Sequence, residues 1–212
     1  MPTGVALTDA RSRLFDAAER LLLDGGPAAA TSRSVTIGAG VAKGVLHRHF
    51  GDFDTFLSEF ALDRLRFLDE AGAHLRAQAG TGDVVENVVA GLAALNPPVV
   101  LALARLTIAR DDLRERLRTA TGTVGIPMFS LAGQHLAGYL TAEQAVGRLS
   151  RDADAAALAG ALLASASMLL DTPHGPGRTA EVRRTVAAVL SGLLPGTPRR
   201  ERLAVPASPD PI

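Results

Sequence analysis

Residues 31–57 read TSRSVTIGAGVAKGVLHRHFGDFDTFL, and this stretch decides the fold. Thr31 or Ser32 can cap a short helix, because a side-chain hydroxyl accepts a hydrogen bond from a free N–H of the first turn. The glycines of residues 38–40, Gly-Ala-Gly, give the backbone the freedom that a sharp turn needs. A second short helix is predicted from about residue 42 to residue 50. Two short helices around a tight glycine turn are the pattern of a helix-turn-helix.

Spacing predicts which side chains of these two helices are buried. Val35 and Ile37 of the first helix are expected to face inward, as are Leu46 and Phe50 of the second. The start of the second helix carries small or polar residues instead, namely Ala42, Lys43, Gly44 and Val45. A helix that enters the major groove of DNA needs such residues there, since bulky apolar side chains would hold it away from the base edges.

Helices are also predicted on both sides of this stretch. Upstream, Thr8 can cap a helix that Gly25-Gly26 ends, and its apolar residues share one face: Leu14, Phe15, Ala18, Leu21 and Leu22. Downstream, Asp52 can cap a long fourth helix that reaches residue 79. Further helices are expected over 83–95, 98–109, 111–140 with an interruption near Gly125 and Pro127, 152–170 and 179–194.

The predicted fold class is therefore all-α, with about nine helices in total and no strand, because no segment alternates with a period of two. Residues 8–52 are expected to form a helix-turn-helix DNA-binding domain, and the helix over 52–79 is expected to connect it to a second domain. Residues 80–195 are expected to form a second, helical domain. Residues 196–212, rich in proline, are expected to be a disordered tail.

The amino-acid composition limits the class of protein further. Hydrophobic residues make up 47% of the chain but only one is Tyr and none is Trp, a mixture that favours close-packed helices. The net charge is zero, which argues against a protein coated in positive charge for unspecific binding to nucleic acid. The absence of cysteine removes disulfides and thiolate metal sites. Neither a signal peptide nor a membrane span is recognisable, so a cytoplasmic location is expected.

Residues 31–57 resemble the tetracycline-repressor (TetR) family of bacterial regulators. The usual run of that family is close to T-x-R-x-I-A-x-x-A-G-V-S-K-G-T-L-Y-x-H-F-x-x-K-x-x-x-L. Counted without gaps, the matching residues are Thr31, Arg33, Ala39, Gly40, Val41, Lys43, Gly44, Leu46, His49, Phe50 and Leu57. With the upstream run RSRLFDAAERLLLDGG, the resemblance covers residues 8–65.

Some positions depart from the family pattern. Ala42 stands where the family has Ser, Val45 where it has Thr, His47 where it has Tyr, and Phe53 where it has the Lys that opens the fourth helix. Each change removes or weakens a donor to DNA phosphate. Binding is therefore expected to depend more on the remaining cations and on backbone N–H groups at helix starts.

The resemblance implies a ligand-responsive regulator, expected to be a repressor, that binds a palindromic double-stranded DNA operator as a homodimer. The predicted DNA contacts are Ser32, Arg33, Ala42, Lys43, Gly44, Val45, His47, Arg48 and His49. Lys43 can donate to O6 or N7 of guanine, and Val45 can contact a thymine methyl group. His47 and Arg48 lie where the helix leaves the groove, so phosphate contacts are predicted for both.

The resemblance also implies that the last two helices, here residues 153–170 and 182–194, form the dimer interface. Ala156, Gly160, Ala164 and Ser167 would give a ridge of small residues there. A small, largely hydrophobic effector is expected to bind in the second domain. The candidate lining residues are Leu103, Arg105, Leu106, Thr107, Met128, Phe129, Leu131, Gln134, His135 and Tyr139. A bend at Pro127 beside this pocket is a candidate for the conformational change.

Two other classes of protein stay open. A DNA-binding regulator without small-molecule control would have the same N-terminal half. A helical enzyme is disfavoured, because the sequence has no cysteine, no H-E-x-x-H motif and no G-x-x-x-x-G-K-[ST] loop. No cofactor and no metal site are predicted. His47 and His49 are two residues apart and do not share a helix face, as metal ligands on one helix would.

Overall fold

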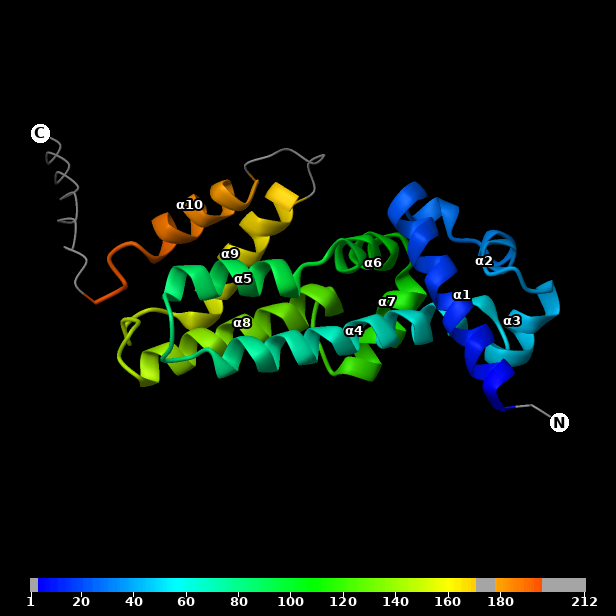
Figure 1. The fold of residues 1–212 in the computed structure, drawn as a ribbon, viewed down its shortest axis with the longest axis horizontal. Helices are drawn as coiled ribbons and strands as arrows, with labels where there is room; N and C mark the ends of the chain where they lie inside the picture. Colours follow the sequence, from blue (N-terminus) through cyan, green and yellow to red (C-terminus); the bar gives the residue numbers. More distant parts are fainter. Residues whose placement is uncertain (1–3, 171–177, 196–212) are drawn as a thin grey trace, which may run out of the picture.

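The computed structural model describes residues 4–170 and 178–195. These residues form ten α-helices and one short 3-10 helix, with no strand among them. The all-α prediction is confirmed, with one more helix than expected because the segment 111–140 is divided. The predicted tail, residues 196–212, lies outside the described residues. Figure 1 shows α1 to α3 gathered at one end of an elongated molecule, with α4 running from them along its length.

The N-terminal helices are α1 (Gly4–Gly25), α2 (Ser32–Gly38) and α3 (Lys43–Phe50), with the 3-10 helix η1 (Pro27–Ala29) after α1. The expected cap at Thr8 is wrong, because α1 already begins at Gly4. Residues 4–7, Gly-Val-Ala-Leu, contain no proline, so nothing in them prevents the helix from extending upstream. The predicted end of this helix at Gly25-Gly26 is confirmed.

The start of α2 is fixed by a reciprocal pair of hydrogen bonds. The Ser34 N–H donates to Thr31 Oγ1 at 3.1 Å, and the Thr31 N–H donates to Ser34 Oγ at 2.9 Å. Thr31 is thus the predicted cap. Val35 is buried as expected, but the prediction for Ile37 is wrong, since 68% of it is exposed. Residues two apart point in different directions on a helix, and Thr36 takes the second inward position.

Phenylalanine rings join these helices to α4 (Phe53–Ala77). The Phe56 ring is fully buried between Phe15 of α1 and Phe50 of α3, with ring centroids 5.7 and 5.0 Å away. Asp52 caps α4 as predicted, because its carboxylate accepts from the Thr55 N–H at 2.6 Å. That hydrogen bond lowers the pKa of Asp52.

Ion pairs add a second connection between α1 and α4. Arg64 of α4 places Nε 2.6 Å from Glu19 and Nη2 3.1 Å from Asp16, both on α1. Only 13% of the Arg64 side chain is exposed, so this pairing is less screened by water than a surface pair. Arg11 of α1 pairs with Glu59 of α4 at 2.6 Å. The orientation of α1 on α4 is therefore set by charge as well as by the aromatic core.

The rest of the chain forms further helices that follow the predicted segments closely. Their bounds are α5 (Val84–Leu95), α6 (Pro98–Ala109), α7 (Asp111–Thr121), α8 (Pro127–Ala145), α9 (Ala155–Leu170) and α10 (Arg178–Leu190). The predicted interruption near Gly125 and Pro127 is confirmed as the boundary between α7 and α8. Gly122 ends α7 with φ 65°, and Pro127 is the first residue of α8, where its missing N–H leaves no bond unmade.

These helices pack in a continuous series. α8 lies against α4 on one side and α9 on the other, and α10 lies against both α9 and α5. The core between them is built from leucine and valine with Tyr139 of α8, which is fully buried. Within the described residues, no single helix is long and apolar enough to cross a membrane. Only α5 and α6 taken together reach that length and composition, and they are bent by 54° at their junction.

A buried charge joins the end of α8 to the turn between α4 and α5. The Glu143 side chain is fully buried; the Gly80 N–H donates to its Oε1 at 3.3 Å, and Arg148 Nε lies 3.5 Å from its Oε2. Arg148 also donates to the carbonyl oxygens of Thr81 and Gly82, at 2.9 and 2.6 Å. Burial raises the pKa of Tyr139, one helical turn away, and the Glu143 carboxylate raises it further.

This tyrosine should make the protein sensitive to alkali. Unfolded tyrosine ionises near pH 10, whereas folded Tyr139 keeps its proton to a higher pH. The stabilisation of the folded state that follows from this raised pKa is therefore complete below pH 10. It is lost as the pH rises above 10, by at most about 1.4 kcal/mol per pH unit. The chain has one tyrosine and no cysteine. Urea unfolding between pH 9 and 11.5 should therefore show a smaller loss of stability for Tyr139→Phe than for the wild type, and equal losses would contradict this account.

Candidate nucleic-acid interface

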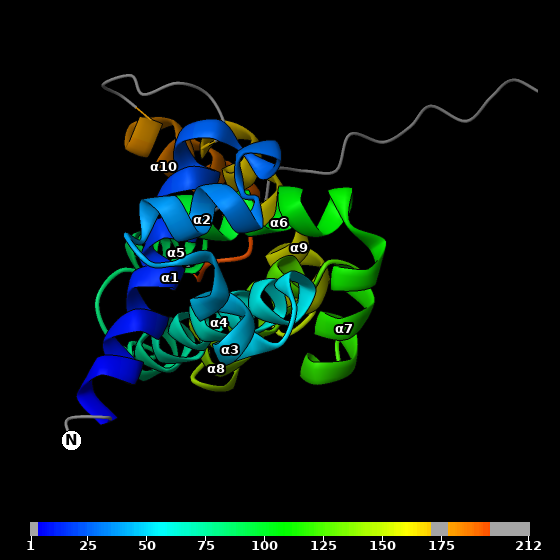
Figure 2. The same cartoon turned by 90° about the vertical axis from the view of Figure 1, so that its right-hand side faces the viewer.

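The start of α3 is open to solvent while its other face is buried. Ala42, Lys43 and Gly44 are exposed, and Leu46 and Phe50 are 0% and 5% exposed. The predictions for Leu46 and Phe50 are confirmed, and the predicted start near residue 42 agrees with Ala42 as the capping position. Seen end-on, α2 and α3 lie together at the tip of the molecule (Figure 2).

The turn between α2 and α3 is held in place from α1. Gly40 has φ 63°, a conformation that favours glycine, and the Val41 N–H donates to the Thr36 carbonyl at 3.0 Å. Arg13 and Arg20 of α1 donate to the carbonyl oxygens of Gly40 and Gly38, at 3.3 and 3.2 Å. These contacts fix the angle at which α3 leaves α2, and so the direction in which its first turn points.

Three cations on this face have no ion pair within the part of the chain that the structure describes. Arg33, Lys43 and Arg48 are exposed, and none has an acidic partner among the described residues. Three of the four acidic side chains of α1 are paired with arginine: Asp9 with Arg13, and both Asp16 and Glu19 with Arg64. Cations that make no internal bond are available to phosphate, which is what a DNA-binding surface requires.

The other predicted DNA contacts differ from one another in how exposed they are. His47 is exposed, with Nδ1 3.0 Å from the Gly51 carbonyl oxygen, so Nε2 is the ring atom left for a phosphate. His49 is half-buried against Phe50, with ring centroids 6.0 Å apart. Val45 is half-buried, and the Ser32 hydroxyl has no hydrogen-bond partner within the described chain. His47 is thus more accessible from the α3 surface than His49.

Gly44 offers a test that separates folding from DNA binding. A Cβ built there meets no atom within 4 Å, so internal packing does not require glycine. Gly44→Ala should keep the fold and stabilise α3 by up to about 0.5–1 kcal/mol. Operator affinity should fall, because the added methyl group holds the helix away from the groove. Thermal unfolding and a binding titration on one preparation measure both, and unchanged affinity would show that the backbone does not approach DNA here.

Within the described residues, the predicted effector-lining residues lie in several different places. Five of them are buried in the core: Leu103, Leu106, Thr107, Met128 and Tyr139. The Thr107 hydroxyl donates to the Leu103 carbonyl at 2.9 Å, so it is already satisfied. Arg105 and Phe129 line an open cavity of about 360 Å³, and His135 lines a different one. Leu131 is half-buried, and Gln134 is exposed.

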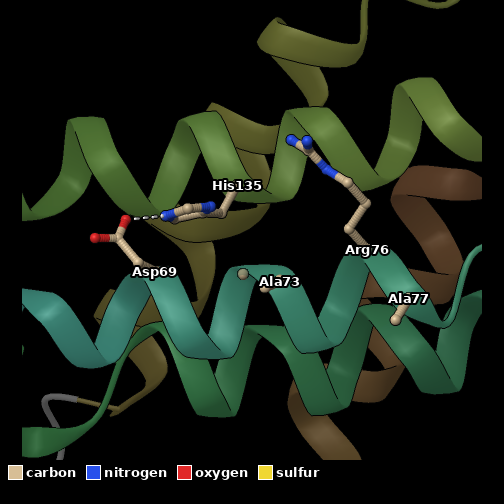
Figure 3. A pocket seen from close by; sticks show the side chains of 6 residues that line it. Asp69, Ala73, Arg76, Ala77 and His135 are labelled. Carbon is tan, nitrogen blue, oxygen red and sulfur yellow. Dashed lines mark hydrogen bonds and ion pairs between the residues drawn. The ribbon is translucent and has the colours of Figure 1, made fainter.

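The cavity at His135 is a groove of about 430 Å³ between α4 and α8, shown in Figure 3. The α4 side contributes Asp69, Ala73, Arg76 and Ala77, and Asp69 lies 3.0 Å from His135 Nε2. These α4 residues are not among the ligand contacts predicted from the sequence. Gly72, a glycine inside a long helix, was the available signal, because such a glycine often marks a close approach. No group of three or more metal-ligating side chains occurs within residues 4–170 and 178–195.

Comparison with known proteins agrees with this geometry. Residues 14–59 match the family described as bacterial regulatory proteins, tetR family. A transcriptional regulator from Saccharomonospora viridis in complex with choline has 18% identity and a TM-score of 0.67, covering 88% of this chain and 98% of that one. The TetR-family regulator PfmR from Thermus thermophilus has 21% identity and a TM-score of 0.62, with coverage of 85% and 98%.

A third solved structure, the fatty acid degradation regulator FadR from Bacillus halodurans, has 17% identity and a TM-score of 0.64 over 87% of this chain and 96% of that one. No curated protein sequence matches the chain. The fold and the exposed α3 are those of a helical protein with an N-terminal helix-turn-helix. The N-terminal domain is that of the tetR family, and the described helices have the TetR-family fold.

Proposed function

We propose that the protein is a homodimeric repressor that binds a palindromic operator through α3 and is released by a small molecule. The observation that carries the DNA-binding part is the face of α2 and α3, where Arg33, Lys43 and Arg48 are exposed without acidic partners in the described chain. Residues 8–52 form the DNA-binding domain in this proposal, α4 is the connector, and residues 80–195 bind the effector and the second subunit. The site is not catalytic, and the regulator acts in the cytoplasm.

The proposed dimer interface is the outer face of α9 with α10. Ala156, Gly160 and Ala164 are exposed on α9, and so are Ala187 and Ala188 on α10. A Cβ at Gly160 would meet no atom within 4 Å. Side chains this small let two helix pairs approach closely and form a four-helix interface. The Ser167 hydroxyl, expected on the same ridge, instead accepts a hydrogen bond at 3.0 Å from Asn96, the residue that follows α5.

Ala164→Arg should therefore prevent dimerisation without unfolding the subunit, because it places a long charged side chain in the centre of this face. Light scattering after size exclusion should give one subunit mass for the variant and two for the wild type. Ala90→Arg on α5, another exposed alanine, is the matched control and should stay dimeric. Dimeric Ala164→Arg would place the interface elsewhere.

Selection of bound DNA from a random pool tests the proposed function as a whole. A two-fold dimer should return a palindrome whose half-sites lie about one helical turn apart, 34–36 Å, or a multiple of it. Absence of any preferred duplex at moderate salt would overturn the proposal. Titration of the selected operator with candidate small molecules then separates ligand control, which predicts release, from a regulator that stays bound.

A further inference from the structure

Two glycines, one on each helix, make room for basic side chains in the groove between α4 and α8. A Cβ at Gly72 of α4 would collide with the imidazole ring of His135, and a Cβ at Gly138 of α8 would collide with the guanidinium of Arg76. Each helix thus has a glycine where the basic side chain of the other lies. Glycine inside a helix is destabilising relative to alanine. The two glycines therefore lower the stability of both helices, but they allow the two basic side chains to lie between them.

Arg76 differs from the other arginines of α4. Arg76 is exposed and has no acidic partner within the described residues, whereas Arg64 and Arg66 of the same helix both face Asp63, at 2.7 and 3.9 Å. His135 is held by Asp69, 3.0 Å from its Nε2. Figure 3 shows the second ring nitrogen, Nδ1, on the edge of the ring turned toward Arg76.

We propose that this groove binds a small carboxylate between Arg76 and His135. The guanidinium has parallel N–H groups that match the two oxygens of a carboxylate. A ring protonated at both nitrogens donates to Asp69 from Nε2 and to the ligand from Nδ1. Asp69 at the rim repels a doubly charged anion more than a singly charged one, which favours a carboxylate over a phosphate. The groove has a volume of about 430 Å³, and the small side chains of Ala73 and Ala77 in its wall leave room for a compact apolar body.

The regulatory part of this inference rests on the proposed function. α4 carries the DNA-reading helices at one end and forms one wall of the groove near the other. A ligand bridging Arg76 of α4 and His135 of α8 changes how these helices sit on each other. Binding of a carboxylate should therefore change operator affinity, and operator should change carboxylate affinity by the same factor.

Binding can be measured without DNA. Acetate, butyrate and benzoate are titrated into the full-length protein while the ring signals of His135 are followed by NMR, with acetamide, butyramide and benzamide as neutral counterparts. At least one carboxylate should give a saturable shift that its amide does not give. Arg76→Gln should weaken that binding by about tenfold or more, because a charged donor is lost. Arg66→Gln, on the same helix and outside the groove, should bind as the wild type does.

The proposal is overturned if none of the three carboxylates shifts His135, or if Arg76→Gln binds them as tightly as Arg66→Gln. A second titration, with the operator obtained by selection, tests the regulatory part: the carboxylate that binds should change operator affinity in the wild type and not in Arg76→Gln. Unchanged affinity refutes the regulatory part alone. A protein that selects no operator refutes the proposed function, and the NMR result still decides the groove.

Discussion

Replacing Phe56 with alanine should lower the free energy of unfolding by about 3–5 kcal/mol, the range for removing a large ring from a packed core. The ring is fully buried and lies within 5.0–6.4 Å, centroid to centroid, of Phe15, Phe50, Phe53 and Phe60. Because those rings belong to α1, α3 and α4, the loss should fall on the whole DNA-reading end. Urea unfolding followed by circular dichroism measures it.

Phe67→Ala is the matched control for this variant. Phe67 is on the same helix, α4, but 55% of it is exposed. Its replacement should change stability by no more than about 0.5 kcal/mol, as is usual for surface positions. If both variants lost the same stability, α4 itself rather than the aromatic core would be the sensitive element.

Lys43→Ala should reduce discrimination at one base pair of each half-site by about 1–3 kcal/mol, because a donor to guanine O6 or N7 is lost. Lys43 is the first residue of α3, is exposed, and has no internal ion pair among the described residues. Folding should therefore be unaffected. Affinities for the selected operator and for each single-base variant of it give the discrimination directly.

The pattern of loss distinguishes the two roles that Lys43 could have. A loss that is equal for every sequence, together with a smaller salt dependence, would make Lys43 a phosphate contact. Arg66→Ala, which removes a cation from an exposed position on α4, should leave both the affinity and the preferred sequence unchanged. Lower affinity in that control would show a general effect of net charge.

Local signals in the sequence were sufficient to predict the helix boundaries around α2, α3 and α4. Thr31 and Asp52 are caps because their side chains bond to the backbone within the same turn, which depends on three or four neighbouring residues only. Ile37 was wrongly placed because hydrophobicity was considered without its angle around the helix. The predicted cap at Thr8 was wrong because a residue that is able to cap a helix does so only where the helix begins.

The groove between α4 and α8 could not be predicted in this way. Asp69 and His135 are 66 residues apart, and they meet only because Gly72 lets the two helices pack closely. The predicted effector residues were chosen for apolar character, which a close-packed core and a cavity wall have in common. Burial of Leu103 or Met128 therefore follows from the sequence, whereas an empty volume beside it depends on the packing of several helices.

The ion pairs of Arg64 have a mechanical consequence. They fasten α1 to α4, so the reading end and this 25-residue helix, about 37 Å long, turn as one rigid lever. A tilt of about 5° at the far end then displaces the tip by about 3 Å. In the proposed symmetric dimer the two tips would move in opposite directions, and a small adjustment between α4 and α8 would then change the distance between them relative to successive turns of DNA.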